Sequence, residues 1–242
     1  MEPSVKKEPL DGGEFKINVS AHHTFGTDAV LLSHFAGAKR KDTLCDLGTG
    51  CGIIPFLMLR DKSLTSCVGV DISAEAIDLA KQSVEDLNIK NFTPICADIK
   101  DLKDKLPAGA FSLVTCNPPY KAQGAGIVNP DDIEAAARHE TLCSLDDIIG
   151  AAARLLTFGG RLCMCHRPER LAELMDKMRR EKIEPKRLRL VCQRMGEEPW
   201  LVLVEGKRGA NTGLRIMPPL YVEENGNLSE EMLSIYGCYK RG

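Results

Sequence analysis

The chain has 242 residues, of which 43% are hydrophobic and 27% charged, and its formal net charge is −2. This length suffices to bury an α/β core as one domain, and the composition is that of a soluble globular protein. No segment approaches the ~20 consecutive apolar residues that a membrane-spanning helix needs. Residues 1–13 are polar and lack the apolar region of a signal peptide, so we expect a flexible lead-in followed by a single domain over residues 14–242.

Predicted strands and helices alternate along the chain, without internal repeats. Strands are expected near residues 43–47, 66–71, 92–96, 111–116, 159–165, 186–193 and 199–205. Helices are expected near residues 27–38, 52–61, 74–88, 144–156 and 168–182. This alternation predicts an α/β fold whose mostly parallel sheet is covered on both faces. The last two strands are joined by a connection too short for a parallel crossover, which predicts a C-terminal antiparallel hairpin.

A glycine-rich turn, DLGTGCG at residues 46–52, lies between the first strand and an apolar helix. Gly48 and Gly50 can adopt dihedral angles closed to other residues, so a ligand can approach the backbone closely. Their spacing differs from the G-x-G-x-x-G of dinucleotide sites. Asp46 would repel a pyrophosphate but could receive a cationic amino group. The alternative is a glycine-rich turn without a ligand.

Two further acidic residues follow the next two strands. Asp71 ends the second strand, where adenosine cofactors have their ribose hydroxyl groups held, and Asp98 follows the third strand, where it could accept from an adenine amino group. Ile72 and Ile99 come directly after them and complete this candidate cofactor site. Each acid alone could simply cap a helix. Acids at the ends of three successive strands, together with the glycine turn, favour a ligand.

The segment NPPY at residues 117–120 follows the fourth strand. Its two prolines remove backbone donors and stiffen the turn. The Asn117 side-chain oxygen and the Pro118 carbonyl are then left to accept hydrogen bonds, and the ring of Tyr120 can stack on a planar group. This combination suits a planar amino group, such as that of adenine or of a glutamine amide. A plain Pro-Pro turn is the alternative.

The glycine turn, the acids at the strand ends and NPPY together resemble class I S-adenosylmethionine-dependent methyltransferases that methylate amino groups. The segments FGTDAVLL at 25–32 and ARHE at 137–140, and the ending 218–237, are similar to bacterial tRNA(Val) adenine N6-methyltransferases. The resemblance implies a Rossmann-like fold with seven strands in the order 3-2-1-4-5-7-6. It also implies S-adenosyl-L-methionine as the cofactor and RNA, above all tRNA, as the substrate.

The resemblance also assigns roles to individual residues. The expected cofactor contacts are Phe25, Gly26, Thr27, Asp46, Gly48, Gly50, Asp71, Ile72, Asp98, Ile99 and Asn117. The expected catalytic residues are Asn117, Pro118 and Tyr120, and the expected substrate contacts are Asn117, Pro119, Tyr120, Lys121 and Arg138. In this interpretation Asn117 and Pro118 accept the two N–H bonds of the amine and aim its lone pair at the methyl group. A protein glutamine N5-methyltransferase and a catalytically silent RNA-binding protein are the alternatives.

Charge and cysteine content add two expectations. Residues 161–215 hold 14 Lys and Arg against 8 Asp and Glu, which indicates either an RNA-binding face or an ordinary solvated helix. Six of the ten cysteines fall in predicted buried strands: Cys45, Cys67, Cys96, Cys116, Cys163 and Cys165. With no export signal, we expect free thiols in a reducing cytoplasm. The spacing of the cysteines and histidines matches no zinc site, so no metal is expected.

Overall fold

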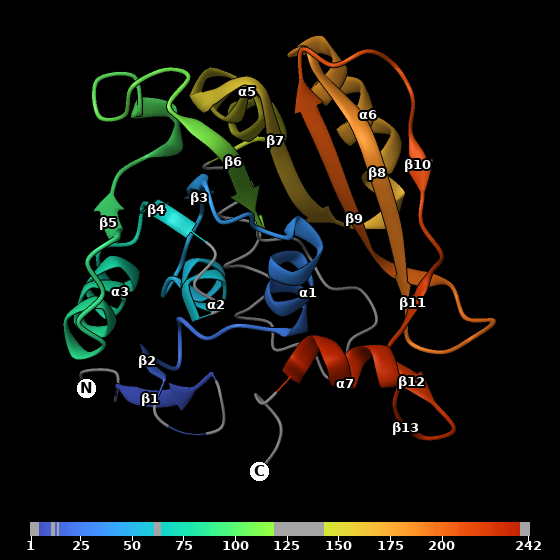
Figure 1. Ribbon diagram of the computed structural model, residues 1–242, viewed down its shortest axis with the longest axis horizontal. Coiled ribbons are helices and arrows are strands. Elements are labelled where there is room, and N and C mark those ends of the chain that lie inside the picture. Colours follow the sequence, from blue (N-terminus) through green and yellow to red (C-terminus); the bar gives the residue numbers. More distant parts are fainter. Residues whose placement is uncertain (1–4, 11–12, 14, 61–63, 119–142, 238–242) are drawn as a thin grey trace.

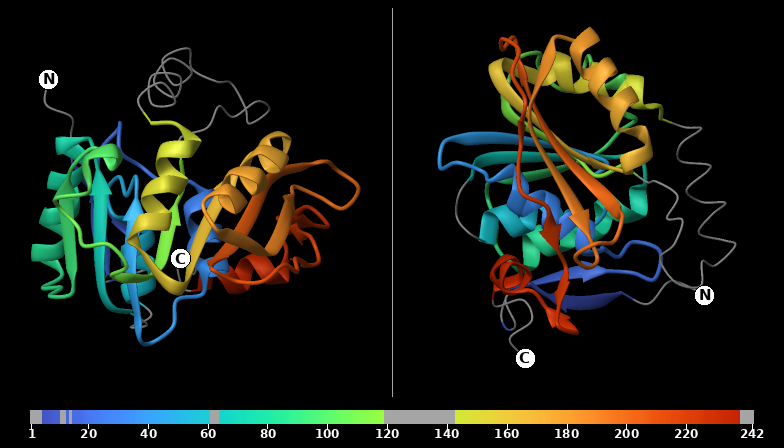
Figure 2. Two further views of the ribbon diagram at one scale, coloured as in Figure 1. Left: turned by 90° about the horizontal axis from the view of Figure 1, so that it is seen from above. Right: turned by 90° about the vertical axis from the view of Figure 1, so that its right-hand side faces the viewer.

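The computed structural model describes residues 5–10, 13, 15–60, 64–118 and 143–237. A nine-stranded sheet forms the centre, and helices cover both of its faces (Figures 1 and 2). The expected α/β architecture with a mostly parallel sheet is therefore confirmed. Among the described residues, no helix is long and apolar enough to cross a membrane.

The main strands are β3 (Asp42–Leu47), β4 (Leu64–Asp71), β5 (Phe92–Cys96), β6 (Phe111–Cys116), β7 (Leu156–His166), β8 (Ile183–Cys192) and β9 (Pro199–Arg208). They lie in the order β5-β4-β3-β6-β7-β9-β8, which is the order 3-2-1-4-5-7-6 of the resemblance. The first five run parallel, whereas β9 is antiparallel to both β7 and β8.

The expectation of seven strands is wrong by two. The short strands β10 (Arg215–Ile216) and β11 (Leu220–Tyr221) both pair in parallel with β8, at the edge of the sheet. Strands of two residues show no alternation of polar and apolar side chains, so periodicity gives no signal for them.

The helices are α1 (Thr27–Ala36), α2 (Ile53–Arg60), α3 (Ala74–Asp86), α5 (Leu145–Leu155), α6 (Leu171–Arg180) and α7 (Glu230–Tyr236), with 3₁₀ turns η1 (Ile99–Asp101) and η2 (Pro168–Arg170). Helices α1, α2 and α3 contribute to the hydrophobic cluster on one face of the sheet, and α5 and α6 to the cluster on the other. Local capping fixes their starts: Ser73 caps α3, and Ser144 and Asp147 form a capping box on α5.

The N-terminal segment is more ordered than expected. Strand β1 (Lys6–Pro9) lies inside the predicted flexible lead-in and pairs antiparallel with β2 (Lys16–Val19). The hairpin is anchored because Leu10 and Ile17 are fully buried and Arg60 donates to the Leu10 carbonyl at 2.8 Å. The buried apolar side chains stabilise a segment whose polar composition alone predicts no structure.

A second hairpin, β12 (Glu223–Glu224) and β13 (Asn227–Leu228), precedes the C-terminal helix α7.

Of the six cysteines expected to be buried, five are, but Cys96 is exposed. It is the last residue of β5, the strand at the edge of the sheet. The nine cysteines among the described residues are free thiols.

Candidate active site

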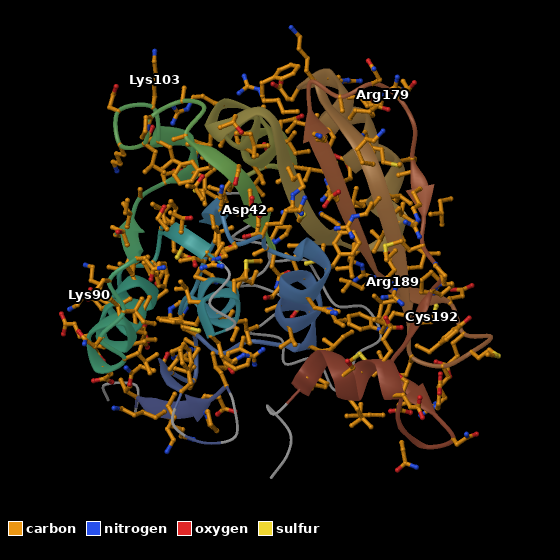
Figure 3. The ribbon with its side chains drawn as sticks, in the orientation of Figure 1. Asp42, Lys90, Lys103, Arg179, Arg189 and Cys192 are labelled. Atoms are coloured by element: carbon orange, nitrogen blue, oxygen red, sulfur yellow. The ribbon has the colours of Figure 1, made fainter. Side chains whose placement is uncertain are left out.

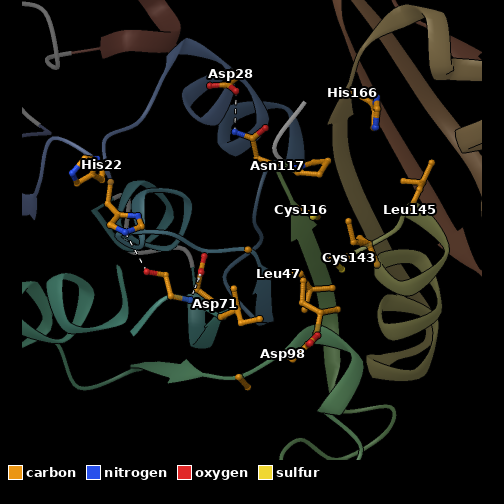
Figure 4. Close-up of a pocket in the computed structure, with 18 of the residues that line it drawn as sticks. His22, Asp28, Leu47, Asp71, Asp98, Cys116, Asn117, Cys143, Leu145 and His166 are labelled. Carbon is orange, nitrogen blue, oxygen red and sulfur yellow. Dashed lines mark hydrogen bonds between the residues drawn. The ribbon is translucent and has the colours of Figure 1, made fainter. Parts of the chain in front are cut away.

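A cavity of about 400 Å³ opens at the carboxyl ends of the parallel strands (Figure 4). Clefts of this size commonly hold small-molecule ligands, and in open α/β sheets they lie at this edge. Seven residues of the predicted site line it: Gly48, Asp71, Ile72, Asp98, Ile99, Asn117 and Pro118. The fold therefore brings together the predicted residues at the ends of β3, β4, β5 and β6.

The glycine turn after β3 forms a cradle at the cavity. Gly48 and Gly50 have φ angles of +72° and +54°, in the left-handed region that favours glycine. A Cβ atom added at either position would meet no described atom within 4 Å. The backbone there is consequently open to a ligand. Gly52 differs, because a Cβ atom would lie 2.9 Å from the ring of Phe56, so its role is close packing.

Asp71 is held in place by the backbone around it. One carboxylate oxygen accepts from the Gly50 N–H at 2.8 Å, and the other accepts from the Ser73 N–H at 2.9 Å. Each oxygen keeps a further lone pair for a ligand hydroxyl group. The Ser73 hydroxyl in turn lies 3.1 Å from Nε2 of His23, which also lines the cavity. The arrangement links the glycine turn, Asp71 and the start of α3.

Asp98 lies at the opposite side of the cavity from Asn117 (Figure 4). Its carboxylate accepts from the Lys100 N–H at 2.9 Å, so it caps η1 as well as lining the cavity. Ile72 is 46% exposed although it is a large apolar side chain, and together with Ile99 it gives the cavity an apolar surface. Such a surface suits the flat face of a planar ring.

Asn117 has a defined orientation at the end of β6. Its Nδ2 donates to the Asp28 carboxylate at 3.0 Å, and its Oδ1 accepts from the Cys165 thiol at 2.8 Å. This oxygen thus already has one donor, because Cys165 on the neighbouring strand β7 reaches it. An amide oxygen has two lone pairs, so one acceptor site remains for a substrate.

Asp46 is placed differently from the expectation. It is fully buried and does not line the cavity, and one of its oxygens accepts from the Thr115 hydroxyl at 2.6 Å. Within the described part of the chain, neither its Oδ2 nor the buried Thr49 hydroxyl has a hydrogen-bond partner of acceptable geometry. Burial raises the pKa of Asp46 to about 7 despite the Thr115 hydrogen bond. The sequence predicts a direct contact between Asp46 and a cationic group of a ligand. The structure instead buries Asp46 outside the lining of the cavity.

Residues 25–28 lie at the start of α1, and of these Asp28 lines the cavity. Phe25, Gly26 and Thr27 do not line the cavity, and neither does Gly50. Gly26 is the N-cap of α1, and Thr27 starts the helix with its hydroxyl 2.9 Å from that of Tyr236. The turn of the helix therefore directs the next residue, Asp28, into the site. Pro119, Tyr120, Lys121 and Arg138 lie outside the described residues.

Several lining residues were not predicted from the sequence. They include Cys143, Leu145 and Ile148 at the start of α5, His166 at the end of β7, and Arg170 before α6. His166 is buried, and its Nδ1 accepts from the Arg167 N–H at 2.8 Å, which leaves the ring proton on Nε2 when the ring is neutral. An ionisable residue at a strand end was the signal that identified Asp71, and the same signal applies to His166.

Two arginines of the basic segment 161–215, which could have formed an RNA-binding face, are engaged in ion pairs. Arg179 lies 3.3 Å from Glu184, and Arg180 lies 2.7 Å from Asp176. Both arginines belong to the last turn of α6, and Arg179 lies at the outer edge of the molecule (Figure 3). Arg170, at the other end of this helix, lines the cavity. The structure thus supports the solvated-helix alternative for Arg179 and Arg180.

Comparison with known proteins gives consistent results. A family model described as a methyltransferase domain matches residues 38–208. The tRNA1(Val) (adenine(37)-N6)-methyltransferase of Parabacteroides distasonis is 29% identical over 182 residues, which are 74% of this chain and 75% of that protein. The enzyme of the same name from Histophilus somni strain 2336 is 33% identical over 166 residues, or 65% of this chain and 67% of that protein.

Solved structures show the same fold. A predicted O-methyltransferase, protein Atu636 from Agrobacterium tumefaciens, matches with a TM-score of 0.69 and 21% identity, over 88% of this chain and 97% of that chain. The geranyl diphosphate C-methyltransferase from Streptomyces coelicolor, solved with S-adenosyl-L-homocysteine, matches with a TM-score of 0.54 and 17% identity, over 74% of this chain and 77% of that chain.

Proposed function

This chain belongs to the methyltransferase domain family, and from this premise we propose that it transfers a methyl group from S-adenosyl-L-methionine to the exocyclic N6 amine of an adenine in tRNA. The observation that carries the proposal is the oriented Asn117 amide, which lines the same cavity as Asp71 and Asp98. The names of the relatives from Parabacteroides distasonis and Histophilus somni support adenine N6 and tRNA.

The residues of the cavity fit this cofactor. Gly48 lines the cavity, and its backbone is open to a ligand because it has no side chain, while the volume of about 400 Å³ suits a nucleoside-sized cofactor. Asp71 would accept hydrogen bonds from the ribose hydroxyl groups, and Asp98 would accept from the adenine amino group. Ile72 and Ile99 would pack against the adenine ring. When bound, the cofactor supplies a methyl group on a positively charged sulfur, which is already activated.

The chain's own contribution to transfer is positioning and charge stabilisation. The lone pair of an adenine N6 amine is delocalised into the ring, which makes it a weak nucleophile. Asn117 Oδ1 and the Pro118 carbonyl would each accept one of its N–H bonds, which favours a pyramidal nitrogen with its lone pair directed outward. The same oxygens would stabilise the positive charge that develops on this nitrogen. An adenine in a tRNA loop must leave its stack to reach these acceptors.

The experiment that tests the proposal is transfer of a labelled methyl group from S-adenosyl-L-methionine to unmodified tRNA. A parallel reaction contains a protein extract in place of tRNA, because a glutamine amide is the other planar amino substrate. The proposal predicts label in tRNA and none in protein. Label in protein alone would identify a protein methyltransferase. Cofactor binding without label in either would identify a catalytically silent member of the family.

A further inference from the structure

The Asn117 side chain has a polar partner on each side, and the two partners differ in what they can accept or donate. Asp28 receives the Nδ2–H of Asn117 at 3.0 Å, as the dashed line in Figure 4 shows. Cys165 donates its S–H to Oδ1 at 2.8 Å. An ionised carboxylate only accepts hydrogen bonds, so a flipped amide would place oxygen against oxygen at Asp28. The carboxylate therefore selects one of the two amide orientations.

Asp28 is itself well fixed. It lies in the first turn of α1, where the helix dipole favours a negative charge. Its second oxygen accepts from the Ala29 N–H at 2.9 Å, and the preceding residue, Thr27, is joined to Tyr236 on α7. The side chain is only partly buried and lines the same cavity as Asn117. A group held this firmly can fix the position of the side chain that it contacts.

We infer that Asp28 is a positioning residue for methyl transfer, acting through Asn117. The inference rests on the proposed function, because it assigns Asn117 Oδ1 to the substrate amine. Asp28 would keep the amide nitrogen turned toward α1, so that Oδ1 presents its remaining lone pair to the substrate amine. Its charge would also polarise the amide through the shared hydrogen bond, which makes Oδ1 a better acceptor for an amine that is becoming positive.

An acid at the position of Asp28 could have two other roles, and each would change different quantities. A residue that only stabilises α1 would change the stability of the chain and leave the chemical step unaffected. A residue that contacts the cofactor directly would change cofactor affinity independently of Asn117. A double-mutant cycle separates these roles, since a residue acting through Asn117 loses its effect once the Asn117 side chain has been removed.

The cycle uses Asp28→Ala, Asn117→Ala and the double variant, assayed for methyl transfer to tRNA. We expect Asp28→Ala to lower kcat about tenfold or more, while KM and the cofactor Kd stay within about threefold. The double variant should be no slower than Asn117→Ala alone. Asp28→Asn, which keeps an acceptor and loses the charge, should fall between wild type and Asp28→Ala. Fully multiplicative losses, or a weakened cofactor Kd at unchanged kcat, would overturn the inference.

The matched control is Asp78→Ala. Asp78 is an exposed acid on α3 that pairs with Lys81. It should leave kcat unchanged. Thermal unfolding of every variant separates effects on catalysis from loss of folded protein, and Asp28→Asn serves as the milder change should Asp28→Ala unfold.

A second readout needs no activity. The side-chain amide signals of Asn117 in ¹⁵N-labelled protein are assigned by their loss in Asn117→Ala. We expect Asp28→Ala to move these signals toward the positions of a solvated amide and to speed their exchange with water. Unchanged signals would show that Asp28 does not hold the amide. If wild type shows the bonded amide but transfers no methyl to tRNA, the proposed function fails while the contact itself stands.

Discussion

The hydroxyl groups of Thr27 and Tyr236 lie 2.9 Å apart and join residues that are 209 positions apart in the chain. Tyr236 belongs to α7 and is buried, and Thr27 starts the helix that carries Asp28. The C-terminal helix thus contacts the segment that presents Asp28 to the cavity.

We expect Tyr236→Phe to destabilise the chain by about 1 kcal/mol, since the partly buried hydrogen bond between the two hydroxyl groups is lost. Denaturant unfolding measures this difference. Tyr221→Phe is the matched control, because Tyr221 accepts from the Ser229 hydroxyl through its backbone carbonyl, which the substitution keeps. Equal stability of Tyr236→Phe and wild type would show that the contact contributes nothing.

A buried ion network joins α1 to the sheet. Arg161 lies 2.8 Å from Asp42 and 3.1 Å from Glu205, and it donates to the carbonyl of Ala36 at the end of α1. Burial opposes ionisation of Glu205, yet Arg187 and Arg161 together hold the pKa of this carboxyl below its usual value. Removing one partner leaves buried charges uncompensated, which is strongly destabilising.

We therefore expect Arg161→Ala to cost about 3–5 kcal/mol of unfolding free energy. Arg180→Ala is the control, because its pair with Asp176 is exposed and such pairs contribute less than about 1 kcal/mol. Chemical denaturation of both variants makes the comparison. Similar losses in the two variants would contradict the assignment of a buried, stabilising network.

The buried carboxyl of Asp46 predicts a pH dependence. Its pKa is raised from 3.8 to about 7 by burial, so the folded chain retains this proton where the unfolded chain has released it. Protonated Asp46 therefore contributes to the free energy of unfolding. This contribution is fully present below about pH 4, is lost as the pH rises through about 7, and amounts to at most roughly 4 kcal/mol. Asp46→Asn mimics the protonated acid and should remove this fall in stability.

Because Asp46 does not line the cavity, Asp46→Asn should also leave cofactor affinity within about threefold of wild type, a change below 1 kcal/mol. Unfolding curves at several pH values and calorimetry with S-adenosyl-L-methionine measure the two quantities. A large loss of cofactor affinity would restore the direct contact that the sequence alone suggests.

Asp71 is the residue on which cofactor binding should depend most. Asp71→Ala removes a carboxylate that would accept two hydrogen bonds from the ribose, each worth about 1.5–3 kcal/mol. Calorimetry should therefore show affinity reduced by about a hundredfold or more. Asp71→Asn keeps one oxygen and should lose less. Asp78→Ala, an exposed acid on α3, should bind as wild type does, and an Asp71→Ala chain that does so too would exclude Asp71 from the site.

Strand ends were the most informative part of the sequence. Parallel strands bring their carboxyl ends to one edge, so Asp71, Asp98 and Asn117 could be placed together from the order of elements alone. The burial of Asp46 could not be predicted in this way, because it depends on how β3 is enclosed between β4 and β6. The contact between Asn117 and Cys165 depends on the register of β6 against β7, which no pattern in the sequence specifies.

The short elements were missed for a different reason. Strands β10 to β13 have two residues each, and β1 has four in a polar segment, so hydrophobic periodicity cannot detect them. They are stabilised by tertiary contacts, such as the burial of Leu10 beside β1 and of Leu220 in β11. Local propensity is a weak guide where the remainder of the fold supplies the stability.

The most direct test of the account is nucleoside analysis of tRNA after reaction with the wild-type chain and with Asn117→Ala. We predict N6-methyladenosine as the methylated product of the wild type. Asn117→Ala should bind the cofactor within a few fold of wild type, but it should form this product about a hundredfold more slowly, which corresponds to the roughly 3 kcal/mol that one aimed transition-state contact contributes. A methyl group at any other position, or product formed by Asn117→Ala at the wild-type rate, would contradict the account.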